Sequence, residues 1–158
     1  MSSFNLEALT VLVRRNVFKR MSSTEDLVLF HGGCHCGKIR FQVSTTPVVD
    51  VYNCNCSICR KKQNLHFVVP DDSFKLLQGE DNLTCYTFNQ HKAKHLFCKT
   101  CGVQSFYKPR SNPNGYGVMP HCIDEDGPVL ETNVKYFDGK NWEKSIVNSD
   151  ILAKSEKR

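Results

Sequence analysis

The chain has 158 residues, 40% of them hydrophobic, which is enough for one domain with a core of its own. No stretch approaches the roughly 20 apolar residues of a membrane helix, so we expect no membrane partner. The net charge is +5, but residues 1–21 hold four basic side chains against one acidic one. The nearly balanced remainder argues against a nucleic-acid-binding face.

Residues 1–25 differ in character from the rest of the chain. Leu6, Leu9, Val13 and Val17 give a loose helical stripe, with Arg and Lys residues towards its end. An Arg-rich segment that is almost free of acidic residues is typical of a mitochondrial presequence. An ordinary N-terminal helix or a flexible tail is the alternative, and the sequence leaves both open.

From Leu27 onwards the sequence predicts strands. Short runs rich in β-branched and aromatic residues are separated by Gly, Pro, Asp and Asn. The predicted strands cover residues 28–31, 38–43, 48–52, 66–69, 83–88 and 103–107. Helix is expected only as a turn over 57–62 and a second one starting near Asn141. We therefore predict one mainly β domain over 26–150, followed by a C-terminal tail over 151–158.

The cysteines bear most directly on function. The nine cysteines occupy positions 34, 36, 54, 56, 59, 85, 98, 101 and 122. Their number is odd, and seven of them fall in tight CxC and CxxC clusters, which suit a shared metal better than disulfides to distant partners. The apolar run 9–13 is too short for a typical secretory signal. We therefore expect metal ligation in an intracellular protein, with the cytoplasm as its first location and mitochondria or the nucleus as alternatives.

Four thiols are predicted to form a closed zinc site. They come in two pairs, each followed directly by glycine: Cys34 and Cys36 before Gly37, and Cys98 and Cys101 before Gly102. A tight turn that points two sulfurs inward often needs positive φ just after the second ligand, which glycine adopts without strain. Two such pairs complete the tetrahedral set that structural zinc requires. This site would tie together most of the domain.

Three further thiols lie within six residues, at Cys54, Cys56 and Cys59. Cys54 and Cys56 face the same side of an extended segment, and Cys56 and Cys59 can face one point from a turn. The local sequence offers no fourth ligand. Three protein ligands with an open position are typical of a reactive zinc, where water or substrate takes the fourth place. These three cysteines are therefore the predicted catalytic group.

The second site could also be closed by a ligand from elsewhere in the chain. The candidates are Cys85, Cys122, His66 and His121. Cys85 is expected to pack in the core as a small hydrophobe, because it alternates with polar residues in a predicted strand. Cys122, beside His121, is the stronger candidate for a fourth ligand or a neighbour of the site.

The three cysteine clusters resemble those of a known family. The motifs GGCHCG at 32–37, CNCSIC at 54–59 and FCKTCGV at 97–103 are similar to those of the glutathione-dependent formaldehyde-activating enzymes. The segments CRKKQN at 59–64 and QSFYKPRSNP at 104–113 resemble its centromere protein V-like branch. The resemblance covers about residues 27–145.

The resemblance implies a fold and an activity. The fold would be several small antiparallel sheets organised around zinc, of the Mss4-like or β-tent type. Two zinc ions would bind, one at Cys34, Cys36, Cys98 and Cys101 and one at Cys54, Cys56 and Cys59. The activity would be that of a carbon–sulfur lyase that joins glutathione and formaldehyde into S-hydroxymethylglutathione. The branch also implies an association with chromatin and microtubules.

Two functions therefore stand against each other. In the first, an open zinc binds a small thiol and activates it towards an aldehyde; Arg110 or the run 60–62 would hold a substrate carboxylate, and His66 or His121 would move a proton. In the second, the chain is a non-catalytic zinc module that binds a protein, chromatin or microtubule partner. Only the enzyme has a use for an open fourth position, and membership of a fold family does not decide between them.

Overall fold

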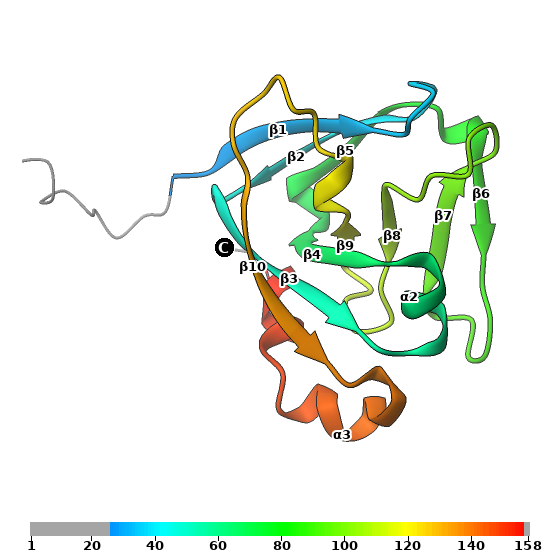
Figure 1. Ribbon diagram of the computed structural model, residues 1–158, viewed down its shortest axis with the longest axis vertical. Coiled ribbons are helices and arrows are strands. Elements are labelled where there is room, and N and C mark those ends of the chain that lie inside the picture. Colours follow the sequence, from blue (N-terminus) through cyan, green and yellow to red (C-terminus); the bar gives the residue numbers. More distant parts are fainter. Residues whose placement is uncertain (1–25, 157–158) are drawn as a thin grey trace, which may run out of the picture.

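The strand-forming runs build two sheets in the computed structural model, which describes residues 26–156 (Figure 1). The smaller sheet has three antiparallel strands in the order β1-β2-β5. They are β1 (Val28–Gly33), β2 (Arg40–Thr45) and β5 (Phe74–Gln78). β2 alternates half-buried and buried residues along its length, as a strand with one face on a core should. The segment 1–25, interpreted above as a presequence or tail, lies outside the described residues.

The larger sheet has seven strands in the order β10-β3-β4-β9-β8-β7-β6. They are β3 (Val48–Cys54), β4 (Leu65–Pro70), β6 (Leu83–Tyr86), β7 (Lys94–Cys98), β8 (Phe106–Lys108), β9 (Gly115–Val118) and β10 (Glu131–Phe137). Neighbours pair antiparallel except β10, which runs parallel to β3. The mainly β prediction is confirmed. The structure adds one parallel pair, β10 with β3. A hairpin cannot join parallel strands, and these two are separated by a long stretch of chain.

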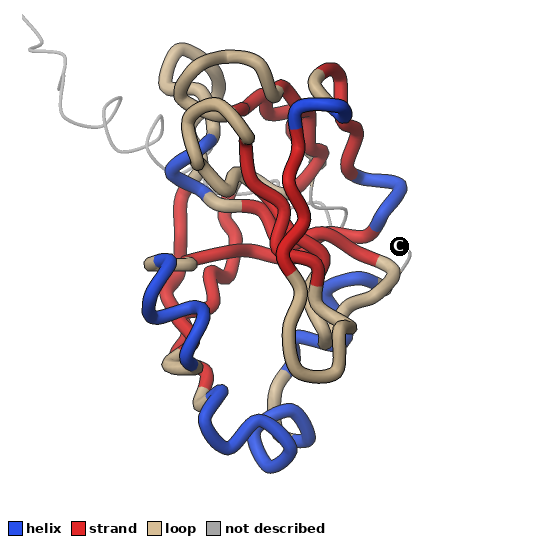
Figure 2. The backbone as a smooth tube through the Cα atoms, turned by 90° about the vertical axis from the view of Figure 1, so that its right-hand side faces the viewer, coloured by secondary structure: helices blue, strands red, loops and turns tan. Residues whose placement is uncertain are grey.

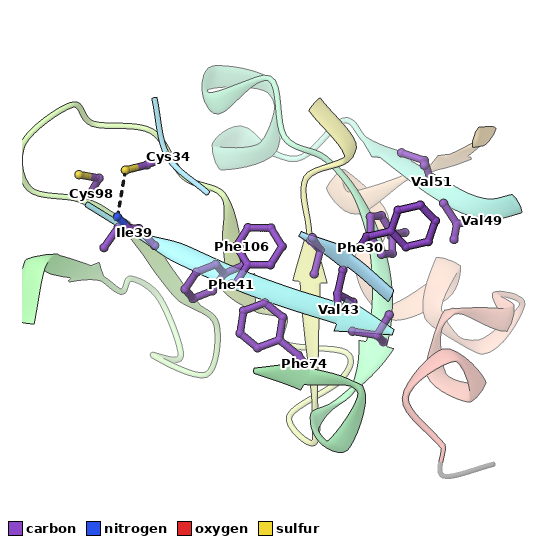
Figure 3. Packing of buried hydrophobic residues seen from close by; sticks show 13 residues of the cluster. Phe30, Cys34, Ile39, Phe41, Val43, Val49, Val51, Phe74, Cys98 and Phe106 are labelled. Carbon is purple, nitrogen blue, oxygen red and sulfur yellow. Dashed lines mark hydrogen bonds between the residues drawn. The ribbon is translucent and has the colours of Figure 1, made fainter. Parts of the chain in front are cut away.

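The main core lies between the two sheets and includes the cysteines Cys34 and Cys98 (Figure 3). Phe41 of β2 stacks on Phe74 of β5 with ring centroids 5.3 Å apart, and it meets Phe106 of β8 edge-on at 5.7 Å. Cys34 and Cys98 belong to the same buried cluster. The thiols are thus built into the hydrophobic core at one end of the interface between the sheets.

Helices are short and lie around the strands rather than covering a sheet face (Figure 2). The two α-helices of the described chain are α2 (Ser57–Lys62) and α3 (Trp142–Val147). The 3-10 turns are η1 (Asp71–Ser73), η2 (Glu80–Asn82), η3 (Pro120–Cys122), η4 (Gly139–Asn141) and η5 (Asp150–Ser155). None of the helices in the described residues is long and apolar enough to cross a membrane.

The segment expected as a C-terminal tail is packed into the domain as far as the structure describes it. Within η5, Ile151 and Ser155 are only 4% and 2% exposed. The buried amide of Asn112 donates hydrogen bonds to the Ile151 carbonyl and to the Ser155 Oγ, each at 2.8 Å. The polar composition of 151–158 concealed these anchors, because they come from a loop almost 40 residues earlier in the chain.

The strands predicted over 28–31, 38–43, 48–52, 66–69 and 83–88 correspond to β1, β2, β3, β4 and β6. The run 103–107 is strand only from Phe106 onwards, because Gly102 and the residues after it shape the turn around Cys101. Strands β5, β7, β9 and β10 were not predicted. β10 is exposed at most of its positions, so it lacks the alternation that marks a half-buried strand.

Candidate metal centres

The structure brings Cys34, Cys36, Cys98 and Cys101 together, with all four sulfurs within 4.8 Å of one another. The Sγ of Cys36 lies 3.5 Å from that of Cys34 and 3.6 Å from that of Cys98. Ligands of a tetrahedral zinc at ~2.3 Å would be about 3.8 Å apart, so the sulfurs already have nearly the required separation. The donor set therefore fits a closed four-thiolate metal site.

Two turns of the same kind present these sulfurs. Gly37 and Gly102 both have φ of 76°, the left-handed conformation predicted from their positions. The Gly37 amide donates to the Cys34 carbonyl at 3.1 Å, and the Gly102 amide donates to the Cys98 carbonyl at 2.9 Å. Each pair is thus held by a tight turn before any metal is considered.

Backbone and side-chain amides surround the thiols of this cluster. The Ile39 amide lies 3.3 Å from the Cys34 sulfur (Figure 3), and the side-chain amide of Asn82 lies 3.1 Å from that of Cys98. Burial acts to raise the pKa of Cys98, but hydrogen bonds from the amides of Cys101 and Thr100 outweigh it and lower the pKa to about 6. The turn therefore favours the thiolate form that metal binding requires.

The second cluster consists of Cys54, Cys56 and Cys59, whose sulfurs also lie within 4.8 Å of one another. Cys54 ends β3, Cys56 is the residue before α2, and Cys59 lies in α2. A strand end followed at once by a helical turn is what lets such closely spaced thiols converge. Among residues 26–156, this second cluster has three possible metal ligands, whereas the first cluster has four.

The far end of the chain supports the loop that carries these thiols. Asn55 receives a hydrogen bond from the Lys140 amide at 3.1 Å, and its own side-chain amide donates to Asp138 at 2.8 Å. A Cβ on Gly139 would lie 2.4 Å from the Cys54 sulfur. Glycine is therefore required at this position, because any side chain would displace the thiol.

The three crowded thiols divide their protons unequally. Hydrogen bonds from Cys54 and Cys59 lower the pKa of Cys56 to about 2, and the amides of Cys59 and Ile58 act in the same direction. Hydrogen bonds with Cys54 and Cys56, together with burial, raise the pKa of Cys59. One thiolate is thus favoured at neutral pH, and a cation at the cluster would favour the other two.

All three thiols line one cavity of about 430 Å³. Its walls come from β3, α2, β4, the loop between β6 and β7, β7 itself, β8 and the loop after it, and the segment from β10 to η5. Aromatic rings supply much of the lining: Tyr52, Phe88, Tyr107, Phe137 and Trp142. A largely apolar cavity with a few polar groups is the usual form of a small-molecule site.

Behind the thiols lies a buried polar wall. The Tyr107 hydroxyl and His66 Nε2 are 3.0 Å apart, and both residues line the cavity. His95 stacks on Tyr107 with ring centroids 5.2 Å apart at 10°. Burial lowers the pKa of His66 to about 4, so its imidazole is neutral at physiological pH. The side-chain amide of Asn64 lies 3.6 Å from the Cys59 sulfur.

The cavity is also cationic. Lys92, Arg110 and Lys140 line it, and no Asp or Glu of the described residues does. The guanidinium of Arg110 stacks 3.6 Å from the centroid of Trp142 and pairs with Glu143 at the surface. A positive, partly apolar cavity favours an anionic small molecule.

The structure separates the other predicted site residues into two groups. Arg110 and His66 line the cavity, whereas the run 60–62 and His121 do not. Lys62 lies instead over the ring of Phe97, 4.7 Å from its centroid. The run follows the third thiol directly, but only the first half of α2 lines the cavity, through Ser57, Ile58 and Cys59.

The expectation for one further cysteine is wrong and that for another holds only in part. Cys122 is not a fourth member of the three-thiol group, but it is buried in one cluster with Met119 and with Tyr107, which lines the cavity. The thiols that act on its pKa are Cys34 and Cys101 of the first cluster. Cys85 is exposed rather than packed in the core, because β6 is the last strand of its sheet and turns this face to solvent.

Sequence reasoning missed most of the cavity wall. His95 and Gly139 gave no motif of their own, and Tyr107 lay within the 104–113 segment without an assigned role, because these roles depend on strand order and not on spacing. The clearest signal available was the pair of adjacent aromatic residues in β8, Phe106 and Tyr107, which are both buried and must therefore face two different packed sides.

Comparison with known proteins agrees with this geometry. Residues 29–139 match a family model described as glutathione-dependent formaldehyde-activating enzyme. The fold is similar to the crystal structure of a Rhodobacter sphaeroides protein, with a TM-score of 0.56 and 30% sequence identity. That match covers 65% of this chain and 99% of the other. The family match spans both thiol clusters and ends at the glycine that lies against Cys54.

Proposed function

This chain belongs to the glutathione-dependent formaldehyde-activating enzyme family, and we propose that it is a zinc-dependent enzyme of the carbon–sulfur lyase type. Its substrates would be a small anionic thiol, glutathione or a relative, and an aldehyde, which it would join or release. One observation carries the proposal: three thiols without a fourth donor among the described residues line a cavity that Lys92, Arg110 and Lys140 line as well. A purely structural metal site has no need of such a cavity.

Two zinc ions are proposed for each chain. Cys34, Cys36, Cys98 and Cys101 would hold the structural ion, and Cys54, Cys56 and Cys59 the reactive one. Zinc bound at the three-thiol group would supply Lewis acidity, so that a thiol entering the fourth position ionises at neutral pH. Free thiols are the ligand form needed, and all nine cysteines are unpaired by disulfides. We accordingly propose an intracellular, reducing location for the protein.

The residues of the cavity would orient the substrate. Arg110 is held in place by Trp142 and can present its guanidinium to a carboxylate in a two-point contact, while Lys140 and Lys92 extend the positive surface. The aromatic walls exclude water from the thiol and strengthen these charge interactions. A carboxylate-bearing thiol is therefore expected to bind better than a neutral one of the same size.

The module hypothesis and the centromere protein V-like branch remain the alternative. A module for protein, chromatin or microtubule partners would use the outer surface of the fold and has no need of a cavity lined by three thiols. The cavity therefore favours the enzyme.

The test is a glutathione titration of the protein with cobalt in both sites. The expected result is two metal ions per chain and a change in the visible spectrum that saturates with glutathione. Cys56→Ser should abolish the response, whereas Cys85→Ser, at an exposed cysteine outside both clusters, should keep it. Two metals without any response to thiol would contradict the enzyme and favour the module.

A further inference from the structure

Resting on the proposed function, we infer that Tyr107 and His66 form an oxygen-binding subsite beside the three thiols. In this subsite the Tyr107 hydroxyl binds the aldehyde oxygen and gives it a proton, and His66 is the positioning residue that holds the hydroxyl. The ligand class of the subsite is a carbonyl or hydroxyl oxygen one or two bonds away from the sulfur-bearing carbon.

The fold builds this pair across three strands. His66 lies on β4 and Tyr107 on β8, and β9 runs between them. Gly117 of β9 pairs with Tyr107 on one side and with Val68 of β4 on the other. The side chains of Tyr107 and His66 meet above it because it has none: a Cβ there would lie 2.4 Å from the Tyr107 ring and 3.1 Å from the His66 ring. The missing side chain leaves the space in which the 3.0 Å contact between the hydroxyl and Nε2 forms.

Burial makes the pair rigid and keeps its polar groups from bulk water. His66 is 3% exposed and Tyr107 is 6% exposed, yet both contribute to the cavity wall. The T-shaped contact between their rings, at 5.1 Å, and the stacking of His95 on Tyr107 fix the hydroxyl in one place. A donor held in this way in a site of low polarity stabilises a developing oxygen charge more than water does.

Asn64 connects the subsite with the thiols. It is the second residue after α2; its backbone amide donates to the Cys59 carbonyl at 2.9 Å, and its side-chain amide lies 3.6 Å from the Cys59 sulfur. Gln63, with φ of 51°, turns the chain so that Asn64 faces back towards the cluster. The short segment 59–66 therefore links one of the three thiols, Cys59, with His66 of the polar wall.

The proposed step balances in atoms and charge. The thiol loses its proton, its sulfur forms a bond to the carbonyl carbon, and the π-electron pair of the carbonyl moves to the oxygen. That oxygen takes the hydroxyl proton of Tyr107, and the proton released by the thiol restores the hydroxyl through solvent. The sum is thiol plus aldehyde to hydroxyalkyl thioether, and the release reaction is its reverse.

The test uses the cobalt-containing full-length protein and two small thiols that differ by one hydroxyl, 2-mercaptoethanol and ethanethiol. Their affinities are read from the visible spectrum, so no turnover is needed. Wild type should bind 2-mercaptoethanol about fivefold more tightly, the preference one net hydrogen bond provides. In Tyr107→Phe the ratio of the two affinities should fall to about one, and in His66→Asn it should fall while the affinity for ethanethiol stays unchanged.

A second readout is turnover. With glutathione and formaldehyde as substrates, the kcat of Tyr107→Phe should drop roughly 100-fold with little change in KM.

Tyr116→Phe is the matched control, since Tyr116 is a core tyrosine on β9 that does not line the cavity, and it should keep the preference of wild type. If wild type binds both thiols but its preference survives in Tyr107→Phe, or is also lost in Tyr116→Phe, the subsite is overturned while the proposed function stands. If neither thiol changes the spectrum of wild type, the proposed function fails and the subsite falls with it.

Discussion

The two thiol clusters of this chain differ in where their ligands come from. The four-thiol cluster joins residues 62 positions apart, and two of its thiols, Cys34 and Cys98, are buried in the core between the sheets. The three-thiol cluster draws all its ligands from one short segment, and distant residues contribute only its surroundings. Ligands from distant segments make a metal part of folding, whereas ligands from one segment leave the fold largely independent of it. The clusters should therefore respond differently to the same damage.

The largest expected difference is between Cys98→Ser and Cys56→Ser. Cys98 is 1% exposed and lies in the core cluster, so losing its thiolate should remove the structural metal and cost roughly 5 kcal/mol or more, which unfolds most domains of this size. Cys56→Ser should cost less than about 2 kcal/mol and release only one metal. Thermal unfolding followed by circular dichroism, together with metal content, measures both. Equal unfolding by the two variants would remove the distinction.

A second comparison uses one glycine at each cluster. Gly139→Ala would place a methyl group 2.4 Å from the Cys54 sulfur, so we expect at least tenfold weaker metal binding at the three-thiol cluster with the fold retained. Gly37→Ala meets no atom within 4 Å but keeps a φ of 76°, so it should retain both metals and cost about 1 kcal/mol of backbone strain. Metal stoichiometry after dialysis and urea unfolding distinguish the cases. Two retained metals in Gly139→Ala would show that the loop can move aside.

The smallest expected effect concerns the charged side chains that support the C-terminal wall of the cavity. Asp150 accepts hydrogen bonds from Lys135 at 2.6 Å and from the Tyr52 hydroxyl at 2.8 Å, next to the cavity residue Ile151. Burial acts to raise the pKa of Asp150, but these bonds outweigh it and lower the pKa to about 2. Because the side chain is 47% exposed, screening reduces the contribution to about 1 kcal/mol.

A carboxylate whose pKa is lowered on folding stabilises the protein above its ordinary pKa of about 4, and the contribution disappears as the pH falls towards 2. Asp150→Asn should therefore lose about 1 kcal/mol at pH 7 in urea unfolding, and the difference from wild type should shrink below pH 4. Comparing variant with wild type at each pH cancels any metal lost to acid. Asp81→Asn, at an exposed turn, is the control. A difference that stays constant down to pH 2 would contradict the ionic origin.

Spacing predicted the convergence of the thiols well, because cysteine pairs encode their geometry locally. The positive φ at Gly37 and Gly102 and the convergence of Cys54, Cys56 and Cys59 follow from a few neighbouring residues. Spacing could not predict the cavity, because its walls come from strands that meet only through the order of the sheet. Tyr107 and His66 are 41 positions apart and face each other across Gly117.

The same reason explains the error over Cys85 and the partial one over Cys122. Alternation in a strand tells which residues share a face, but not whether that face is covered, and β6 lies at the edge of its sheet. Proximity to His121 suggested a ligand role for Cys122, yet η3 directs this thiol into the protein beside Met119. Chain neighbours alone do not determine which cluster a lone cysteine joins.

The parallel pairing of β10 with β3 affects the order in which the protein is assembled during translation. The seven thiols have all been synthesised by residue 101, whereas the strand that supports the Cys54 loop and the wall that follows it are made only from residue 131 onwards. Synthesis proceeds from the N-terminus, so a nascent chain has every metal ligand well before it has an enclosed cavity. Metal loading can therefore precede closure, because the thiols of the Cys54 loop stay uncovered until β10 and the residues after it have been made.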